Sequence, residues 1–293
     1  MKNFMAFIVG LSAVAIAPDV LDALGQTAPT FEVASVKENT SAQGMQRVGF
    51  APGGRFTAVG ASAKDLITVA YGTPQPLAAF RVLGGPGWIA SDRFDVNAKA
   101  AGDPQPGPTG PPQELLLMVR SLLEDRFKLA AHTETRELPI YLLLPDRSDG
   151  KPGPQLQVST VDCAALMRGR GGVPPPPPPP GVRPPCGSMG SPGRLSMGSA
   201  TMTMLAMFLS RLTNRVVVDR TDWTDRFDGT LEFTPDQMMP LPPGPLPPGI
   251  QPPPTDGPSL FTALREQLGL KLESSRGPVD VVVVDHIEPP SPD

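Results

Sequence analysis

The residues of this sequence that could carry chemistry are few and widely spaced. Ser148 and Lys151 form a Ser-x-x-Lys pair, a spacing that activates a serine nucleophile when the pair opens a helix inside a cleft. Here the pair stands in the stretch "DRSDGKPG", which is composed of residues that favour turns. We therefore interpret the pair as part of a loop.

The two histidines of the chain are the next candidates. His132 and Glu134 fall two residues apart in the alternating stretch "KLAAHTETR", which predicts that both side chains lie on one face of a strand. Such a pair could act as an acid and a base, or bind a metal ion. A solvated strand face gives the same pattern, and we favour it for His132 and find no better role for His286.

Four aspartates spaced by three residues form a third candidate, since calcium prefers carboxylate oxygens. They are Asp219, Asp222, Asp225 and Asp228. Arg220 and Arg226 are interleaved with them, and the sequence lacks a glycine-turned ligand loop of the calcium-binding type. We interpret these aspartates as carboxylates that stabilise turns.

The usual sequence signatures of enzymes are missing. The sequence contains no nucleophile elbow, no HExxH, no GxGxxG after a strand and no P-loop. We accordingly predict no catalytic, cofactor-binding or metal-binding residues and no cofactor. The formal net charge of -4, without a basic cluster interleaved with aromatic residues, lacks the attraction that binding to nucleic acid requires.

The first residues have the layout of a secretory signal. Lys2 precedes an apolar run from Phe4 to Ala17, which is too short to remain in a bilayer as a helix. We expect residues 1–25 to be the signal peptide and the mature protein to be periplasmic or extracellular. No stable membrane span is expected after cleavage.

The expected export bears on the two cysteines, because disulfides persist in oxidising compartments. Cys163 and Cys186 flank a segment without apolar periodicity, and a pair of this kind in an oxidising compartment favours a disulfide over a reactive thiol. The segment contains the run Pro174–Pro180, which must adopt polyproline II geometry. We interpret that run as a rigid spacer, with binding by an aromatic groove as the alternative.

A short motif occurs twice, beside the only two tryptophans of the chain. "WIASDRFD" begins at Trp88 and "WTDRFD" begins at Trp223, so that Phe94 and Phe227 take the same place in each copy. The four aromatic residues are expected to anchor the core of two related units. The aspartates and arginines of the motif are expected to decorate a turn.

The elements around the motif also follow one order. Each copy predicts a strand, a helix, two strands, a second helix and a final strand pair, which is a two-layer α+β sandwich. Ser62 with Asp65 forms a capping box before the first helix of the first copy. In the second copy, apolar residues at helical spacing mark the corresponding helix: Met202, Leu205, Phe208, Leu209 and Leu212.

Turn residues predict how each copy ends. "TRELP" and "SRGPV" separate two apolar stretches in "KLAAHTETRELPIYLLL" and in "LKLESSRGPVDVVVVDHI", so we expect a strand pair in each place. The predicted organisation is therefore two tandem βαββαββ-like units joined by proline-rich loops. They occupy residues 26–160 and 193–293, with a linker rich in cysteine and proline at 161–192.

Two resemblances rest on these stretches. The chain, with "FEVASVK", "LLEDRFKL", "ETRELPIYLL" and "GLKLESSRGPVDVVVVDHI", resembles an uncharacterised family abundant in soil acidobacteria, a domain of unknown function. The second copy, with "MTMLAMFLSRLTNRVVVDRTDW" and "SLFTALREQLGLKLE", resembles the short N-terminal domain of secretins and TonB-dependent receptors. The resemblances imply envelope signalling or assembly through contacts between proteins, and no catalytic residues.

The signal, the duplicated unit and the missing enzyme motifs lead to one functional expectation. The protein is expected to be a non-enzymatic extracytoplasmic adaptor that binds another envelope or secreted protein. An exported hydrolase or lyase, or a protein that binds a small molecule or glycan, is the alternative. A pocket that gathers polar groups around His132 or Asp95 favours the alternative, and a flat exposed strand edge favours the adaptor.

Overall fold

Three four-stranded sheets organise the part of the chain that a computed structural model describes. The described residues are 28–41, 46–72, 76–104, 111–169, 178–179, 182–235 and 256–290. The expected signal peptide at 1–25 and most of Pro174–Pro180 lie outside them. The architecture of these residues is α+β, as the sequence predicts, and none of their sheets closes into a barrel.

The first sheet has the strand order β1-β5-β3-β2, with every pair of neighbours antiparallel. Its strands are β1 (Val33–Glu38), β2 (Arg47–Ala51), β3 (Arg55–Ala61) and β5 (Phe94–Lys99). Helices α1 (Ala63–Ala70) and α3 (Gln113–Arg126) share its core. Phe56 and Ala58 alternate toward that core, and the predicted capping box at Ser62 and Asp65 opens α1.

The second sheet has the order β7-β11-β9-β8, again antiparallel throughout. Its strands are β7 (Leu156–Val158), β8 (Gly187–Ser191), β9 (Arg194–Ala200) and β11 (Phe227–Glu232). Helix α5 (Met202–Thr213) begins at the N-cap Thr201, lies over the sheet and ends at Asn214 in the left-handed conformation. The chain reaches the corresponding strand positions of both sheets in the same order.

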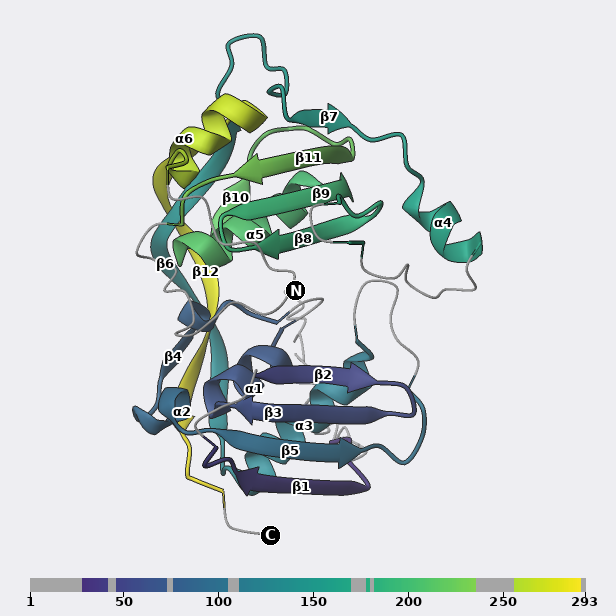
Figure 1. Ribbon diagram of the computed structural model, residues 1–293. Coiled ribbons are helices and arrows are strands. Elements are labelled where there is room, and N and C mark those ends of the chain that lie inside the picture. Colours follow the sequence, from purple (N-terminus) through teal and green to yellow (C-terminus); the bar gives the residue numbers. More distant parts are fainter. Residues whose placement is uncertain are drawn as a thin grey trace, which may run out of the picture.

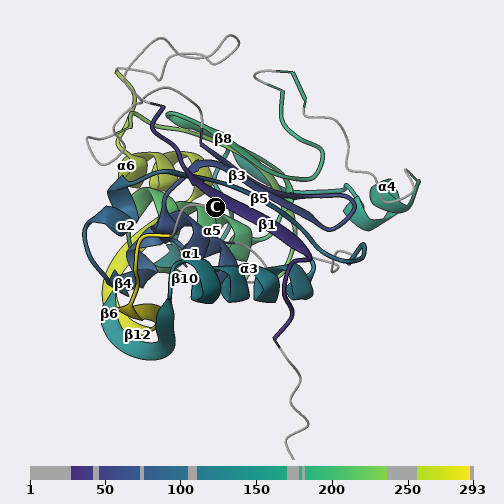
Figure 2. The ribbon, with the colours of Figure 1, turned by 90° about the horizontal axis from the view of Figure 1, so that it is seen from below.

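The remaining elements are short. They are the 3-10 turn η1 (Ala79–Arg81), β4 (Val82–Gly84), α2 (Trp88–Ser91), α4 (Cys163–Gly169), β10 (Val217–Asp219), α6 (Leu260–Ala263) and the π-helical turn η2 (Leu264–Leu268). In the view from below, helices lie between the two sheets described above and the two long strands of the third sheet (Figure 2). No helix in the described ranges is long and apolar enough to cross a membrane.

Two long strands join the halves of the molecule. They are β6 (Ala130–Pro145) and β12 (Leu270–His286), which pair antiparallel along almost their whole length and which we call the ribbon. β10 adds in parallel to one end of β6, and β4 adds in parallel to the opposite end of β12, giving the order β10-β6-β12-β4. Figure 1 shows the ribbon running from the second sheet to the first.

The predicted strand pairs at "TRELP" and "SRGPV" are wrong. Each stretch continues as one strand, and the two meet across the ribbon, where Pro139 pairs with Arg276 and Pro278 with Glu137. Proline is tolerated here because the middle of the ribbon has no strand on either outer side, so a missing N–H breaks no ladder bond. Each stretch predicted as a pair of short strands is therefore one long strand that runs from one half of the molecule to the other.

Each of the two main cores takes residues from both predicted units, 26–160 and 193–293. The core of the first sheet includes Val282 and Val284 of β12, and the core of the second sheet includes Leu143 of β6. A smaller cluster around Ile140 and Val281 covers the middle of the ribbon. The organisation as two tandem related units stays a prediction, and each of the two cores includes a strand from the other unit.

Candidate strand-binding edge

The repeated motif has a clear local role beside the first sheet. Trp88 packs edge-on against Phe94, with ring centroids 6.3 Å apart, and Phe94 is buried in the core. The Asp95 carboxylate accepts hydrogen bonds of 2.8 Å from the Gly60 N–H and from the Asn39 side chain. It thereby holds the bulge where β3 shifts its register against β5.

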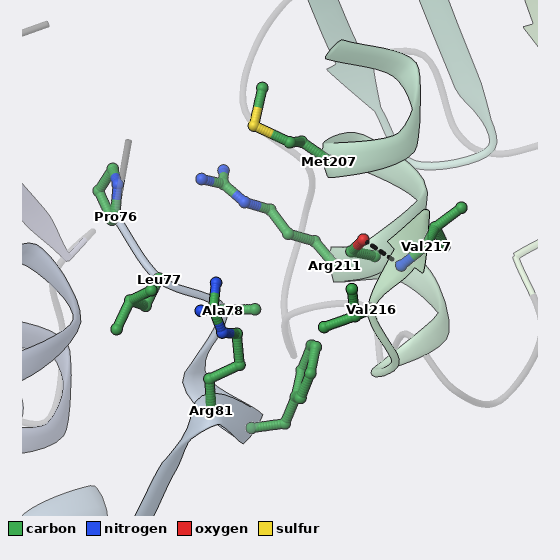
Figure 3. A pocket seen from close by; sticks show the side chains of 10 residues that line it. Pro76, Leu77, Ala78, Arg81, Met207, Arg211, Val216 and Val217 are labelled. Atoms are coloured by element: carbon green, nitrogen blue, oxygen red, sulfur yellow. Dashed lines mark hydrogen bonds between the residues drawn. The ribbon is translucent and has the colours of Figure 1, made fainter. Parts of the chain in front are cut away.

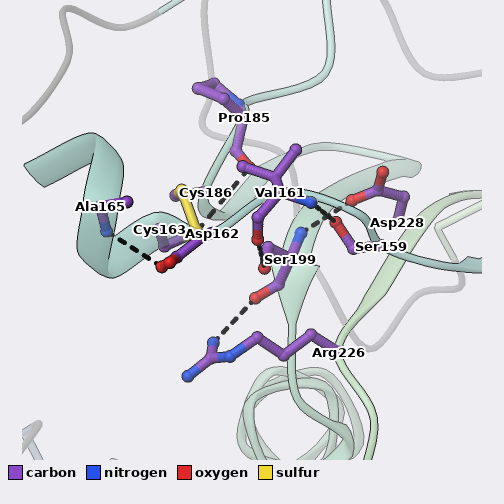
Figure 4. The surroundings of a disulfide bond; sticks show 10 residues. All are labelled: Ser159, Val161, Asp162, Cys163, Ala165, Pro185, Cys186, Ser199, Arg226 and Asp228. Carbon is purple, nitrogen blue, oxygen red and sulfur yellow. Dashed lines mark hydrogen bonds between the residues drawn. A yellow bond between two sulfur atoms is a disulfide. The ribbon is translucent and has the colours of Figure 1, made fainter.

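The second copy holds an equivalent bulge in β9 (Figure 4). Trp223 packs against Phe227, and the Asp228 carboxylate accepts from the Ser199 N–H at 2.8 Å. Arg226 donates to the carbonyl of the same serine at 2.9 Å. The last aspartate of each motif therefore holds a bulge in the neighbouring strand, and we call Asp95 and Asp228 the clamps. The sequence did not indicate this role, because the N–H groups that they bind are 35 and 29 residues away, respectively.

The predicted disulfide is confirmed. Cys163 and Cys186 are joined with an S–S distance of 2.02 Å, and Figure 4 shows the bond beside the bulge at Ser199. Cys163 opens α4, where Asp162 accepts from the Ala165 N–H at 2.9 Å, and this hydrogen bond lowers the pKa of the Asp162 carboxyl. Cys186 directly precedes β8, so the disulfide fixes the start of that strand.

Close backbone packing also fixes this point. A Cβ at Gly198 would lie 1.8 Å from the carbonyl oxygen of Pro184, so only glycine lets the segment before Cys186 cross β9. Ser199 adds a hydrogen bond from its hydroxyl to the Val161 carbonyl. The start of β8 is therefore held from both ends of the disulfide loop.

β8 is an edge strand with an open outer side. Its two-residue turn to β9 makes Ser191 and Arg194 a hydrogen-bonded pair, so the N–H and C=O groups of Ser188 and Gly190 point away from β9. Within the described ranges these groups have no partner. The strand carries no charge, four of its residues are exposed, and the Met189 side chain is 38% exposed.

β2 occupies the matching edge of the first sheet. It and β8 are the edge strands on the sides of the two sheets that face each other (Figure 1). By the same alternation, the N–H groups of Val48 and Phe50 point away from β3. The open edges of β2 and β8 therefore face each other.

Several other strand edges in the described ranges are protected. Pro139 and Pro278 interrupt the outer sides of the ribbon, next to the exposed Arg136 and Glu137. β1 ends in Lys37 and Glu38, and β7 has only three residues. β2 carries the charged Arg47 and is largely half-buried, whereas β8 carries no charge and is mostly exposed, so β8 is the edge best suited to receive a further strand.

β8 lies in the segment 161–192 that the sequence led us to expect as linker. Glycine and serine give the stretch "GSMGS" no apolar alternation, so its pattern does not indicate a strand. The available signal was the Pro-Gly dipeptide between "GSMGS" and "RLSMGSA", which marks a tight turn between two strands.

The histidine candidate forms an exposed ionic cluster on the ribbon. The Nδ1 atom of His132 lies 2.8 Å from a carboxylate oxygen of Asp285, and its Nε2 atom lies 3.8 Å from Glu134. The hydrogen bond to Asp285 raises the pKa of His132, with the negative charges of both carboxylates adding to it. His286 pairs instead with Glu288. His132 and Glu134 thus share a strand face, as expected, in an open position.

The other candidates are dispersed among turns. Asp149 forms a two-pronged ion pair with Arg147 and accepts from the Lys151 N–H, so the stretch from Ser148 to Lys151 is a loop; these contacts lower the pKa of Asp149 strongly. Asp219 accepts from Thr221. Asp219 and Asp228, two of the four aspartates of the ladder, thus serve separate hydrogen bonds. Within the described ranges, no three acidic, histidine or cysteine residues gather as metal ligands would.

Comparison with known proteins gives one match. A family described as protein of unknown function (DUF3738) matches residues 64–287, from α1 to the end of β12. No curated protein and no solved structure matches the chain.

Proposed function

Since the chain belongs to the DUF3738 family, whose description states no function, we propose from its geometry that it is a non-enzymatic extracytoplasmic adaptor. It binds an extended, uncharged segment of another exported protein, which pairs with the outer side of β8. The observation that carries this proposal is the open, uncharged edge at Ser188 and Gly190 of β8, within the residues that the structure describes.

The chemistry of the expected partner follows from β8 itself. A strand that pairs there gains backbone hydrogen bonds from Ser188 and Gly190, and these bonds do not depend on its sequence. The surface around them holds no charge from β8, and the exposed Met189 offers a flexible apolar contact. An uncharged segment with a small apolar side chain opposite Met189 fits this surface.

The disulfide supports the location outside the cytoplasm, because such bonds persist in oxidising compartments. The predicted signal peptide at residues 1–25 points to the same place. A role in envelope signalling or assembly, and an origin of the two sheets from one duplicated unit, belong to this proposal. The duplication would explain why each sheet has one open edge on the same side.

A single proline tests the edge. Ser188→Pro removes an N–H that points outward and leaves the pairing of β8 with β9 intact, whereas Ser188→Ala keeps the N–H and removes only the hydroxyl. Both variants should retain the thermal midpoint of the parent protein. Partners captured by chemical crosslinking in the native envelope should be lost with Ser188→Pro and retained with Ser188→Ala.

A second pair of substitutions separates the adaptor from an enzyme. Replacement of both His132 and His286 by glutamine should leave partner recovery and cellular phenotype unchanged. An enzyme that uses histidine as its acid and base would lose about a hundredfold or more of its rate. Equal capture by Ser188→Pro and Ser188→Ala, or loss of all phenotype in the folded histidine variant, would contradict the proposal.

A further inference from the structure

A cavity of about 180 Å³ lies between the two halves of the molecule, beside the middle of the ribbon. On one side it is lined by the segment before β4, and on the other by α5 and the start of β10 (Figure 3). The lining residues are Pro76, Leu77, Ala78, Phe80, Arg81, Met207, Ser210, Arg211, Val216 and Val217.

Two guanidinium groups supply the charge of this cavity. Arg81 donates through Nε to the Asp280 carbonyl at 2.7 Å, which fixes its side chain and leaves its terminal nitrogens free to bind. Burial lowers the pKa of Arg81, while the charge of Asp280 acts in the opposite direction. Arg211 extends from α5 toward Pro76 and Leu77 (Figure 3). Among the described residues Arg211 has no ion-pair or hydrogen-bond partner for its side chain.

The rest of the lining is apolar or already satisfied. Ser210 uses its hydroxyl to accept the Val217 N–H at 2.8 Å, which Figure 3 shows as a dashed line. The other side chains are hydrocarbon, aromatic or thioether groups, and among the described residues no aspartate or glutamate side chain lines the cavity. Two cationic donors thus face a small apolar space without an acidic partner.

We infer that this cavity binds a small aliphatic carboxylate, whose charged end lies between Arg81 and Arg211 and whose apolar end contacts Leu77 and Met207. Guanidinium groups suit this role because their N–H groups match the two oxygens of a carboxylate. The volume holds on the order of six water molecules, which limits the ligand to a few carbon atoms. The ligand is a free short-chain acid or the C-terminal residue of a peptide.

Such a ligand would connect the two halves of the molecule. Arg81 precedes β4, which joins the end of β12, and Arg211 belongs to the helix that precedes β10, which joins the end of β6. A carboxylate held by both arginines adds a contact across the ribbon. Because the ligand binds only the folded protein, it should raise the thermal midpoint in proportion to its occupancy.

Titration by NMR tests the inference with 3-methylbutanoate as the probe, 3-methylbutanamide as its neutral counterpart and inorganic phosphate as an anion without an apolar end. A dipeptide ending in a free valine carboxylate, and the same peptide amidated, distinguish the two sources of the ligand. We expect saturable shifts of the Val216 and Val217 amides with 3-methylbutanoate or the free peptide, at dissociation constants between about 0.1 and 10 mM. The two amides, which lack a carboxylate, should produce none.

Matched arginine variants complete the test. Arg211→Gln should weaken binding about tenfold or more, because it removes a charged donor. Arg220→Gln is the control, since Arg220 is exposed in the same half and does not line the cavity. Absence of saturable shifts with either carboxylate, equal binding of the neutral amide or of phosphate, or equal weakening by both variants would overturn the inference.

Discussion

The two sheets hold the same bulge with different residues. In the first sheet Gly60, at φ +60°, donates its N–H to Asp95, and a Cβ at this position would lie 3.9 Å from the Asn39 side-chain nitrogen. In the second sheet Ser199 takes this place at φ +46° and donates to Asp228. A left-handed serine costs about 1 kcal/mol or more compared with glycine.

The extra contacts of Ser199 explain why a strained residue is retained there. Its hydroxyl donates to the Val161 carbonyl and its own carbonyl accepts from Arg226, so it ties the segment before the disulfide to β9. The first sheet has no disulfide loop to hold and uses glycine. In the first sheet the clamp therefore only holds the bulge, whereas in the second sheet it also helps to anchor the segment that leads to the edge strand β8.

The largest effects should be equal in the two sheets. Phe94 and Phe227 are both buried, at 3% and 2% exposure, so Phe94→Ala and Phe227→Ala should each reduce the free energy of unfolding by about 3–5 kcal/mol. Urea denaturation measures both, with Val59→Ala on the exposed side of β3 as the control. A loss below about 1 kcal/mol for either phenylalanine would break the equivalence.

Removal of the disulfide should affect only the second sheet. Cys163→Ser together with Cys186→Ser opens a loop with a sequence separation of 23 and should cost about 2–4 kcal/mol of unfolding free energy. Amide hydrogen exchange should accelerate in β8 and β9 and stay unchanged in β2 and β3. A uniform acceleration across both sheets would show that the disulfide does not act locally.

The clamps should contribute less than the aromatic anchors and about equally. Asp95→Ala and Asp228→Ala each leave a bulge N–H without its acceptor, which should cost about 1–3 kcal/mol. The ion pair of Asp228 with Arg183 adds little, because the arginine is 48% exposed. Thermal and urea unfolding compare the two variants. An effect of one clamp alone would mean that the bulges are not equivalent.

Exchange of the bulge residues should sharpen the contrast. Gly60→Ser places a side chain at positive φ and should cost about 1 kcal/mol. Ser199→Gly removes a similar strain but also a hydrogen bond of about 1 kcal/mol, so its net effect should be close to zero. Calorimetry of both variants checks the signs, and a stabilised Gly60→Ser protein would contradict this account of the bulge.

The smallest effect concerns the two ends of the ribbon. Both histidines of the chain lie at or next to the end by the first sheet, so only that end should respond to pH near neutrality. Asp285 raises the pKa of His132, so the stabilisation is fully present below the unfolded value of about 6.5 and is lost as the pH rises through the folded value. NMR titration should show the pKa of His132 falling in Asp285→Asn; an unchanged His132 would refute the pairing.

Local signals predicted the local elements of this fold. The capping box of Ser62, the apolar face of α5 and the cysteine pair each depend on neighbouring residues or on one clear chemical preference, and all three are present. The continuous strands β6 and β12 could not be predicted this way. Pro139 and Pro278 indicate turns in isolation and become strand residues only because each strand pairs with the other, over 130 positions away.

The candidate site was harder to predict than the fold. An open edge is a property of what a strand lacks on one side, and the sequence of β8 contains only glycine, serine and Met189. The cavity between Arg81 and Arg211 likewise joins segments that the ribbon brings together. Neither feature has a local pattern from which it could be recognised.

Position-specific photocrosslinking tests the proposed strand-binding edge most directly. A photoreactive residue replaces Met189 in β8 or, in a matched variant, Val158 in β7 on the opposite edge of the same sheet; both side chains are exposed. In the native envelope, the account predicts an adduct with another exported protein from position 189, absent in combination with Ser188→Pro, and none from position 158. Equal adducts from both positions, an adduct only with a second copy of the chain, or none from position 189 would contradict it.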